Sequence, residues 1–293
     1  MLGCTQSLPQ ETRTLAQARQ GFQTRLVSAG AHPEPLDVPP SGLFYTVKYP
    51  APGGGLAAYL SPDPGDGKRH PAIVWITGGD CNSIGDVWSP APRDNDQTAS
   101  AYRQAGLVMM FPSLRGGNQN SGTKEGFFGE VDDVIAATEF LKKQPYVDPN
   151  RIYLGGHSTG GTLVLLVAEC SNLYRAVFSF GPVADVSHYG EDSGFLPFNV
   201  SDSQEVKLRS PGYWLSSIST PVWVFEGTGQ GNIQEVRAMA RASTNSKVHF
   251  LEVSGETHFS CLAPTNALIA QKLLQDTGDT STLAFTQDEV NHH

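Results

Sequence analysis

Cysteine is scarce in this chain: its 293 residues include four, namely Cys4, Cys81, Cys170 and Cys261. No two of them have the short spacing of metal-ligand pairs, so the sequence argues against a zinc site. Four cysteines in a chain of this length are also too few for a fold that depends on disulfide bonds. One disulfide bond between two of the four cysteines is an alternative that the sequence leaves undecided.

Long apolar runs and excess positive charge are also missing. The longest apolar run, "LVLLVA" at 163–168, is far shorter than the roughly 20 residues that a transmembrane helix needs. The formal net charge is −9, whereas binding to nucleic acid requires a basic surface. With 39% hydrophobic residues the chain can still bury a core, so a globular protein that binds neither nucleic acid nor the membrane interior is expected.

The first four residues, "MLGC", are similar to the end of a bacterial lipoprotein signal, in which a small residue precedes the lipidated cysteine. The hydrophobic stretch that should come before such a cysteine is not in the chain. Two localisations therefore stay open: an envelope lipoprotein anchored through Cys4, and a cytoplasmic protein.

Apolar segments rich in β-branched and aromatic residues alternate with amphipathic segments along most of the chain. Strands buried on both faces are predicted at 72–77, 106–112, 151–156, 175–181, 221–227 and 247–253, after two shorter candidates at 43–49 and 56–60. Helical spacing of apolar residues occurs over 131–141, and helices are also predicted at 232–243 and 265–276. This alternation predicts an α/β fold, with a mostly parallel central sheet and helices on both faces.

The chain divides into an N-terminal part, residues 1–42, and a body, residues 43–293. The N-terminal part contains a helix predicted over 11–27 and a Pro-rich linker, "HPEPLDVPPSG". In the body, the loops 78–97 and 182–219 are longer than a connection requires, as functional loops often are. The aromatic residues of 182–219 favour a lid-like insertion over the site, although a small satellite core is the alternative: Tyr189, Phe195, Phe198, Tyr213 and Trp214.

The stretch "GGHSTGG" at 155–161 lies between a predicted strand, "RIYL", and an apolar helical run, "TLVLLVAEC". Gly156, Ser158 and Gly160 fill the Gly-x-Ser-x-Gly pattern in the strand–turn–helix context that gives the pattern its meaning. Such a turn lifts the hydroxyl above the sheet, next to the N–H groups of a helix N-terminus. The pattern predicts Ser158 as a nucleophile; a purely structural glycine turn is the alternative.

A serine hydroxyl needs a base, and three histidines follow it before the C-terminal tail. His188 lies in the long insertion, and His249 lies within a strand pattern where a structural role is expected. His258 follows the last strand in "VSGETHFS". The chain order of serine, acid and histidine therefore favours His258 as the base.

From about residue 43 to 276 the chain resembles an α/β-hydrolase, closest to the catalytic domain of the prolyl oligopeptidase family. The stretches that carry the resemblance are "VWITGG", "FPSLRGGNQNSG", "YVDPNRIYLGGHSTGG", "FGPVADV" and "SGETHFS". The resemblance implies Ser158 as nucleophile, His258 as base and the backbone N–H of Thr159 as one oxyanion donor. It also implies an α/β-hydrolase fold for the body.

Three features depart from the family pattern. The 42 or so residues before the first core strand are too few for the family's β-propeller. Many of its peptidases have a tyrosine after "VWI", where this chain has Thr77, so a backbone N–H near Gly79 or Asp80 is the expected second oxyanion donor. The usual acid is missing as well, because "EGTGQGN" places Gln230 at its position.

Three carboxylates are candidates for the missing acid, since a glutamine cannot carry the charge that stabilises an imidazolium. Glu226 is favoured, because it lies four residues earlier on the same strand and its longer side chain can make up distance. Asp185 follows the preceding strand, and Glu256 lies two residues before His258. A site without any acid also stays open.

The sequence therefore predicts a serine hydrolase that cleaves small esters or short peptides through an acyl-enzyme on Ser158, with no metal and no organic cofactor. A catalytically weak or inactive binding protein is the alternative motivated by Gln230, and an acyltransferase would use the same serine. Cys81 and Cys261 should lie near one pocket, since both follow strands at the same edge of the sheet. The oligomeric state is not indicated.

Overall fold

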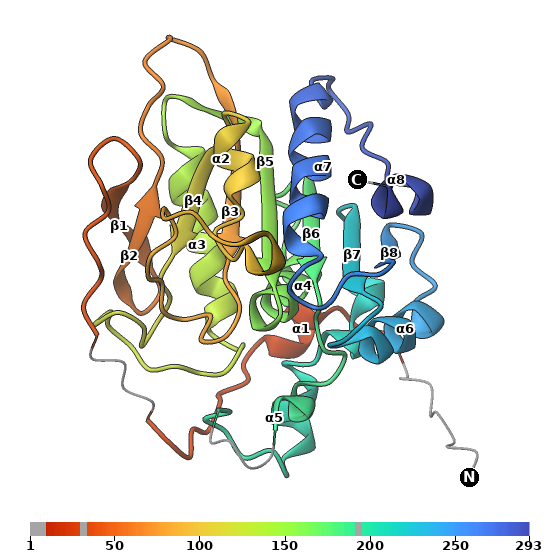
Figure 1. Cartoon of the computed structure of the whole chain (residues 1–293). Coiled ribbons are helices and arrows are strands. Elements are labelled where there is room, and N and C mark those ends of the chain that lie inside the picture. The colour runs from red at the N-terminus through yellow and green to blue at the C-terminus, as the bar shows by residue number, and fades with distance from the viewer. Residues whose placement is uncertain (1–9, 30–33, 191–194, 293) are drawn as a thin grey trace.

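The structure is a computed structural model, and it describes residues 10–29, 34–190 and 195–292 (Figure 1). Cys4, on which the lipoprotein hypothesis depends, lies outside these residues. None of the helices in the described ranges is long and apolar enough to cross a membrane.

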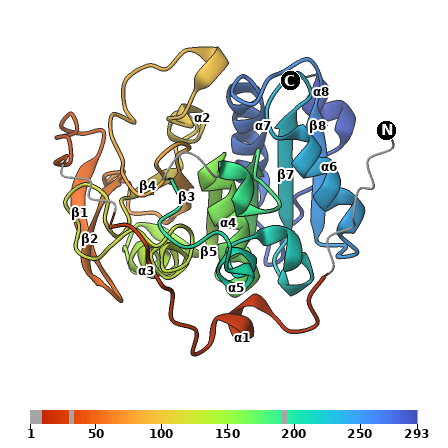
Figure 2. The ribbon, with the colours of Figure 1, turned by 90° about the horizontal axis from the view of Figure 1, so that it is seen from below.

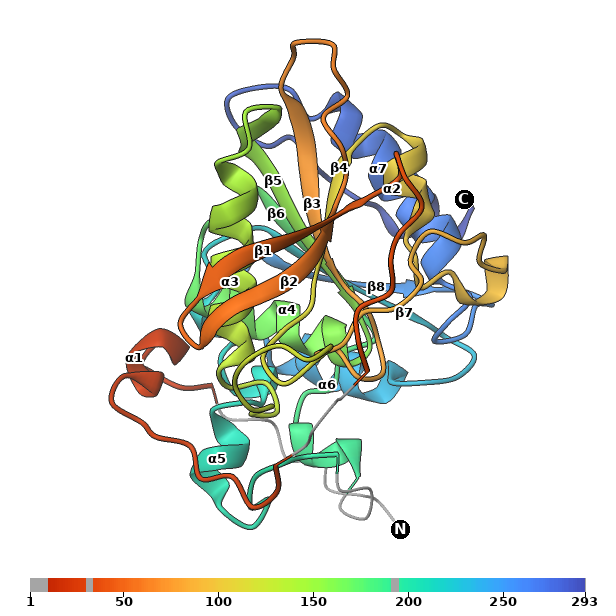
Figure 3. The same ribbon diagram turned by 90° about the vertical axis from the view of Figure 1, so that its left-hand side faces the viewer.

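A single eight-stranded sheet, in the order β1-β2-β4-β3-β5-β6-β7-β8, forms the centre of the described structure. β2 is antiparallel to both β1 and β4, whereas every pair from β4 to β8 is parallel. The strand direction rotates across the sheet, so that β1 and β2 cross the later strands at a large angle (Figure 3). The strands are β1 (Tyr45–Ala51), β2 (Gly54–Leu60), β3 (His70–Ile76), β4 (Val108–Pro112), β5 (Val147–His157), β6 (Ala176–Phe180), β7 (Val222–Gly227) and β8 (Val248–Val253).

Helices cover the sheet on both faces (Figure 2). One layer contains α3 (Glu130–Lys142), α4 (Thr159–Cys170) and α6 (Ile233–Ala242), with α1 (Leu15–Arg19) outside it. The other contains α2 (Ser100–Gln104), α7 (Leu262–Gln275) and α8 (Gln287–Asn291). The predicted α/β architecture is confirmed.

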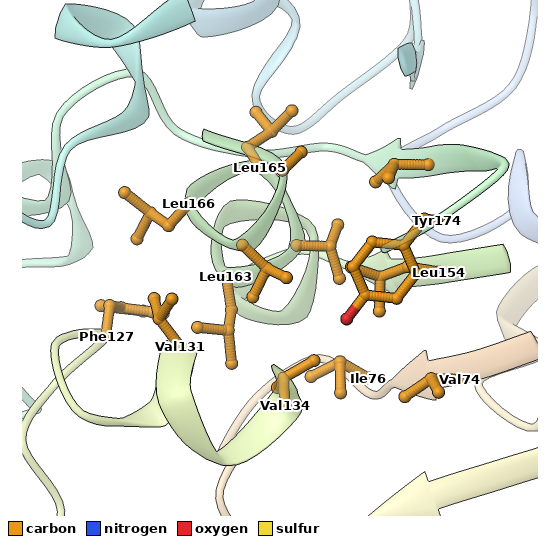
Figure 4. Packing of buried hydrophobic residues seen from close by; sticks show 14 of the residues in the cluster. Val74, Ile76, Phe127, Val131, Val134, Leu154, Leu163, Leu165, Leu166 and Tyr174 are labelled. Carbon is orange, nitrogen blue, oxygen red and sulfur yellow. The ribbon is translucent and has the colours of Figure 1, made fainter. Parts of the chain in front are cut away.

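Two hydrophobic clusters fill the space between the sheet and these layers, because successive strand residues point to opposite faces. On β3, Val74 and Ile76 pack toward α3 and α4, whereas Ile73 and Trp75 pack toward α2 and α7. Figure 4 shows the first cluster, in which α4 lies directly over the sheet. This double burial explains why the strands are continuously apolar in sequence.

The helix predicted over 11–27 is wrong in its extent, because only Leu15–Arg19 is helical. Thr14 begins it with a capping box, and Gly21, at φ 76°, follows its end. Leu15 and Ala18 are buried in the α3–α4 cluster. The N-terminal segment is thereby packed onto the body.

The insertion 182–219 is built from short helices: η2 (Val186–Tyr189), α5 (Ser203–Lys207), η3 (Pro211–Tyr213) and η4 (Leu215–Ser217). Phe198 and Trp214 are buried within the core, and Arg209 is fully buried with its guanidinium bonded to Glu205. Part of the insertion therefore belongs to the main hydrophobic core and not to a separate satellite core.

Candidate active site

Ser158 stands at the sharp turn between β5 and α4. Its backbone angles, φ 56° and ψ −115°, are strained for a residue with a side chain. Its N–H donates to the carbonyl of Phe180 at 2.7 Å, which ties the turn to β6. A Cβ atom at Gly160 would lie 2.3 Å from the carbonyl oxygen of Ile76, so only glycine fits there. The turn has the geometry expected of a nucleophile elbow.

His258 and Glu226 form a buried pair at the carboxyl end of the sheet: Glu226 is the last residue but one of β7, and His258 follows β8. The Nδ1 atom of His258 lies 2.9 Å from Oε1 and 3.2 Å from Oε2 of Glu226. A carboxylate can only accept, so Nδ1 carries the hydrogen and Nε2 is left with a lone pair. This is the distance expected for an acid that orients a base.

Neighbouring groups hold this pair in place. The backbone N–H of Asn232 donates to Oε1 of Glu226 at 2.7 Å, and the Asn232 side chain donates to the carbonyl of Gly181 at 2.7 Å. A Cβ atom at Gly181 would lie 2.4 Å from Cε1 of His258 and 2.5 Å from Oε2 of Glu226. The backbone of Gly181 therefore lies directly against both side chains.

In the described residues, no hydrogen bond joins the Ser158 hydroxyl to His258. Serine–histidine bonds are often long before substrate binds and tighten in the reacting complex. The lone pair on Nε2 of His258 is the acceptor that such a bond would use.

The loop that follows β3, residues 78–97 (the β3 loop), lies against the elbow. The Thr159 hydroxyl donates to the carbonyl of Gly79 at 2.8 Å. The Thr159 N–H belongs to the first residue of α4, where a helix offers no internal partner. The Asp80 carboxylate is bonded to Lys124 at 2.8 Å and to Ser83 at 3.0 Å, so its side chain is occupied elsewhere.

The other acid candidates are bonded to groups other than the base. Asp185 accepts from the N–H and hydroxyl of Ser187 and from the Tyr213 hydroxyl. Glu256 pairs with Arg93 at 2.7 Å. Neither carboxylate is bonded to His258 among the described residues, and Gln230 is exposed. Of the three carboxylates, the structure brings only Glu226 to the base.

The remaining histidines have other surroundings. His188 is 54% exposed and lies 3.0 Å from Glu235. His249 stacks on Trp223 with ring centroids 5.3 Å apart. Among the motif residues, Arg115 of "SLRGG" binds Asp133 through two nitrogens, each at 2.8 Å.

Cys81 and Cys261 pack on opposite faces of the sheet, and their place near one pocket stays a prediction. Both thiols are free and buried. Cys81 belongs to the cluster under α3 and α4, whereas Cys261 belongs to the cluster on the other face of the sheet. No disulfide bond joins Cys81 to Cys261.

An aromatic group from the insertion lies next to the elbow. The Tyr189 and Thr162 hydroxyls lie 2.6 Å apart, one helical turn after the nucleophile position. Tyr189 stacks on Phe127 at 5.5 Å, and Phe195 lies 5.7 Å from Tyr189. Phe198, by contrast, is 2% exposed and cannot contact a substrate.

Sequence reasoning missed Asn232 and His157, both of which touch the Glu226–His258 pair. The available signal was proximity to the motifs: His157 immediately precedes Ser158, and Asn232 ends the "EGTGQGN" stretch. Within the described residues, no group of three or more histidines, cysteines or carboxylates could hold a metal ion.

The parallel sheet, the serine elbow and the histidine–glutamate pair together define the α/β-hydrolase fold class. Residues 93–293 match the prolyl oligopeptidase family (Peptidase_S9), and the chain belongs to that family. This is the family that the sequence resemblance implied.

Known relatives and structures agree with this assignment. The chain is 25% identical over 243 residues to dipeptidyl-peptidase 5 of Porphyromonas gingivalis, a match that covers 74% of this chain and 34% of that protein. It is 28% identical over 203 residues to the peptidase YtmA of Bacillus subtilis, covering 65% and 74% of the two chains. A puromycin-hydrolyzing peptidase of Mycobacterium tuberculosis has the same fold, with a TM-score of 0.62 at 19% identity, covering 82% of this chain and 40% of that one. The chain thus spans about a third of the dipeptidyl peptidase's length.

Proposed function

We propose that the protein cleaves short peptide amides and small acyl esters through an acyl-enzyme on Ser158. The observation that carries this proposal is the contact of 2.9 Å between Nδ1 of His258 and Glu226, which supplies an acid despite Gln230. The family's acid position is vacant in sequence, yet a carboxylate reaches the same ring nitrogen from β7.

In the first half of the reaction, the Ser158 oxygen attacks the substrate carbonyl carbon and its proton moves to Nε2 of His258. The carbonyl oxygen becomes an oxyanion, which the N–H of Thr159 and a backbone N–H at Gly79 or Asp80 stabilise. Nε2–H then protonates the leaving amine or alcohol, and the acyl group stays on Ser158.

In the second half, His258 takes a proton from water, and the resulting hydroxide attacks the acyl carbon. The tetrahedral intermediate collapses, and Nε2–H returns its proton to the Ser158 oxygen. The carboxylic acid leaves and the enzyme is restored. Throughout, Glu226 holds the ring in the Nδ1–H form and stabilises its cation.

The substrate class follows from the family and from the wall of the site. The relatives are peptidases, which favours a peptide substrate. Tyr189 and Phe195, both partly exposed, supply apolar surface near the elbow for a side chain or acyl group, and the buried Phe127 packs behind them. Since the acyl step is common to both, esters with good leaving groups should also react.

A fluorophosphonate probe tests the proposal directly, because it labels only an activated serine. The protein should be labelled and should hydrolyse p-nitrophenyl esters and peptide p-nitroanilides, and Ser158→Ala should abolish both. Asp185→Asn provides a matched control outside the triad and should label normally. Folded wild-type protein that resists the probe would instead support the alternative of a binding protein, and preferential transfer to added amines would support an acyltransferase.

A further inference from the structure

His157, the last residue of β5, is a fully buried histidine that the mechanism above does not use. Its Nε2 atom lies 2.9 Å from the backbone carbonyl oxygen of His258. A carbonyl can only accept, so Nε2 of His157 carries a hydrogen and donates it. The residue before the nucleophile is thereby bonded to the backbone of the base.

The other ring nitrogen of His157 faces Gln97. If Nε2 donates, Nδ1 is the acceptor in the neutral ring, and the Gln97 side-chain nitrogen lies 2.8 Å from it. The Gln97 oxygen accepts from the N–H of Gly78 at 3.3 Å, and its nitrogen also donates to Asn95 at 3.0 Å. The Gln97 oxygen also lies 3.2 Å from Nδ1 of His157, but two acceptors form no hydrogen bond, so the shorter contact from the Gln97 nitrogen is the bond in this tautomer.

The surroundings of His157 favour its neutral form. Burial, with a further contribution from His258, lowers the pKa of His157 to about 3. The His258 ring faces it at 4.5 Å and Phe259 at 5.4 Å, and the carboxylate on that side, Glu226, is bonded to His258. A neutral ring adds no charge that would oppose protonation of the base during catalysis.

We propose that His157 and Gln97 are positioning residues that hold the catalytic base and the β3 loop in register on either side of Ser158. Gln97 joins the two ends of the β3 loop, since Gly78 is its first residue. His157 then connects this closed loop to the backbone of His258. The inference rests on the hydrolase function proposed above.

The expected consequence lies in catalysis more than in binding. The base must stay within hydrogen-bond reach of the serine, and a misplacement of about 1 Å can cost about 100-fold in rate. Loss of the bond to the His258 carbonyl should therefore lower kcat while leaving KM nearly unchanged.

Two substitutions, each of which replaces one side of the His157 ring by an amide (half-mimics), test the two hydrogen bonds of the ring one at a time. In His157→Gln the amide nitrogen can replace Nε2 and keep the bond to His258; in His157→Asn the shorter amide replaces the Nδ1 side and cannot reach that carbonyl. We expect His157→Asn to lower kcat about 10- to 100-fold with KM within about threefold, and His157→Gln to stay within about threefold of wild type. Gln97→Leu, a change at a partly exposed position, should lower kcat about 3- to 10-fold by releasing Gly78.

A second readout does not need activity. The Nδ1 proton of His258, bonded to Glu226, should give a low-field proton NMR signal in wild type and in His157→Gln, and a shifted or lost signal in His157→Asn. His249→Asn, at a histidine on β8 away from the site, is the matched control and should leave kcat and the signal unchanged.

The inference is overturned if His157→Asn keeps wild-type kcat and the wild-type signal, or if His157→Gln falls as far as His157→Asn in step with a lower melting temperature. Failure of the proposed function looks different. In that case, wild-type protein shows the signal but no probe labelling, and the NMR comparison of the two half-mimics still decides the positioning role.

Discussion

At Glu226 a longer side chain compensates for an earlier position along the strand. Its carboxylate lies in β7, four residues before Gln230, and is fully buried. Two hydrogen bonds fix it, from the His258 ring and from the N–H of Asn232. The proposed acid therefore approaches the proposed base from the strand itself instead of from the loop that follows.

Replacement of this acid is the sharpest test at the scale of one residue. Glu226→Gln keeps the shape but removes the charge that stabilises the His258 cation. Loss of a triad acid costs up to about 10⁴-fold in kcat, so we expect a loss of about 100-fold or more, measured by steady-state kinetics on an activated ester.

Two further substitutions bound this interpretation. Asp185→Asn should cost far less, because its carboxylate is bonded to Ser187 and Tyr213. Gln230→Asp should add little, since Glu226 already occupies Nδ1 of His258. A silent Glu226→Gln together with a sharp gain in Gln230→Asp would contradict the assignment.

Glu169 is another buried carboxyl group, at the far end of α4 from the serine. Both of its oxygens are buried without a hydrogen-bond partner among the described residues. Desolvation by burial raises its pKa well above the ordinary value of 4.5. The folded protein therefore favours its protonated form.

This shift makes stability depend on pH at Glu169. Because the folded-state pKa is above the unfolded value, the protonated group stabilises the fold fully below about pH 4.5, and this contribution is lost as pH rises through the folded-state pKa. Glu169→Gln has no such loss, so it should raise the free energy of unfolding by about 1–3 kcal/mol at about pH 8 and by little near pH 4.5. Denaturant unfolding at both pH values measures this.

The exposed Glu34 supplies the control, since Glu34→Gln should change stability at neither pH. If Glu169→Gln were equally stabilising at both pH values, ionisation of this side chain would not be the cause.

At the scale of elements, the insertion 182–219 contributes to the hydrophobic core and is predicted to line the site as well. Phe195 is partly exposed and lies 4.3 Å from the Nζ atom of Lys124, which in turn binds Asp80 of the β3 loop. Phe198 is buried and lies under the Arg209 guanidinium at 4.1 Å. Two phenylalanines three residues apart therefore have different predicted roles.

Truncation of each phenylalanine separates these roles. Phe195→Ala should raise KM for bulky acyl esters more than for acetate esters, because it removes apolar surface near the elbow. Phe198→Ala should instead lower the free energy of unfolding by about 3–5 kcal/mol, with similar effects on both esters. The experiment pairs ester kinetics with denaturant unfolding. If Phe195→Ala raised KM equally for both esters, the insertion would stabilise the fold without contacting the substrate.

The sheet was predictable from sequence because its strands are buried on both faces and carry uninterrupted apolar residues. Predicted 72–77 corresponds to His70–Ile76, and predicted 221–227 to Val222–Gly227. The elbow could be predicted from sequence as well, since a Cβ atom in place of its glycines would lie as close as 2.3 Å to backbone atoms.

Features that depend on long-range contacts were not predictable. The helix over 11–27 was overextended because a local pattern does not show where tertiary packing stops, here after Leu15 and Ala18. The bond between Nε2 of His157 and the His258 carbonyl joins residues 101 positions apart. Such a contact has no local pattern, and the same holds for the hydrogen bond from Asn232 to Gly181.

At the scale of the whole molecule, the N-terminal segment 10–28 is tied to both the body and the insertion. Arg19 donates to Asp132 on α3 at 2.9 Å, and the N–H of Arg25 donates to Glu205 on α5 at 2.7 Å. The side chain of Leu15 is fully buried in the core cluster under α4. The segment is therefore expected to unfold together with the catalytic body, not as a separate tail.

This cooperativity gives the last prediction. Leu15→Ala should lower the free energy of unfolding of the whole protein by about 2–4 kcal/mol in one transition, because it opens a cavity in the shared core. Val27→Ala, at a position of the same segment that is 69% exposed, should change it by less than about 0.5 kcal/mol. Denaturant unfolding followed by tryptophan fluorescence reports on the body, since Trp75 and Trp214 are buried there. If Leu15→Ala left this transition unchanged and only increased proteolysis before residue 42, the segment would be an independent appendage; a shared shift of the single transition makes residues 10–28 part of the folding unit that carries Ser158.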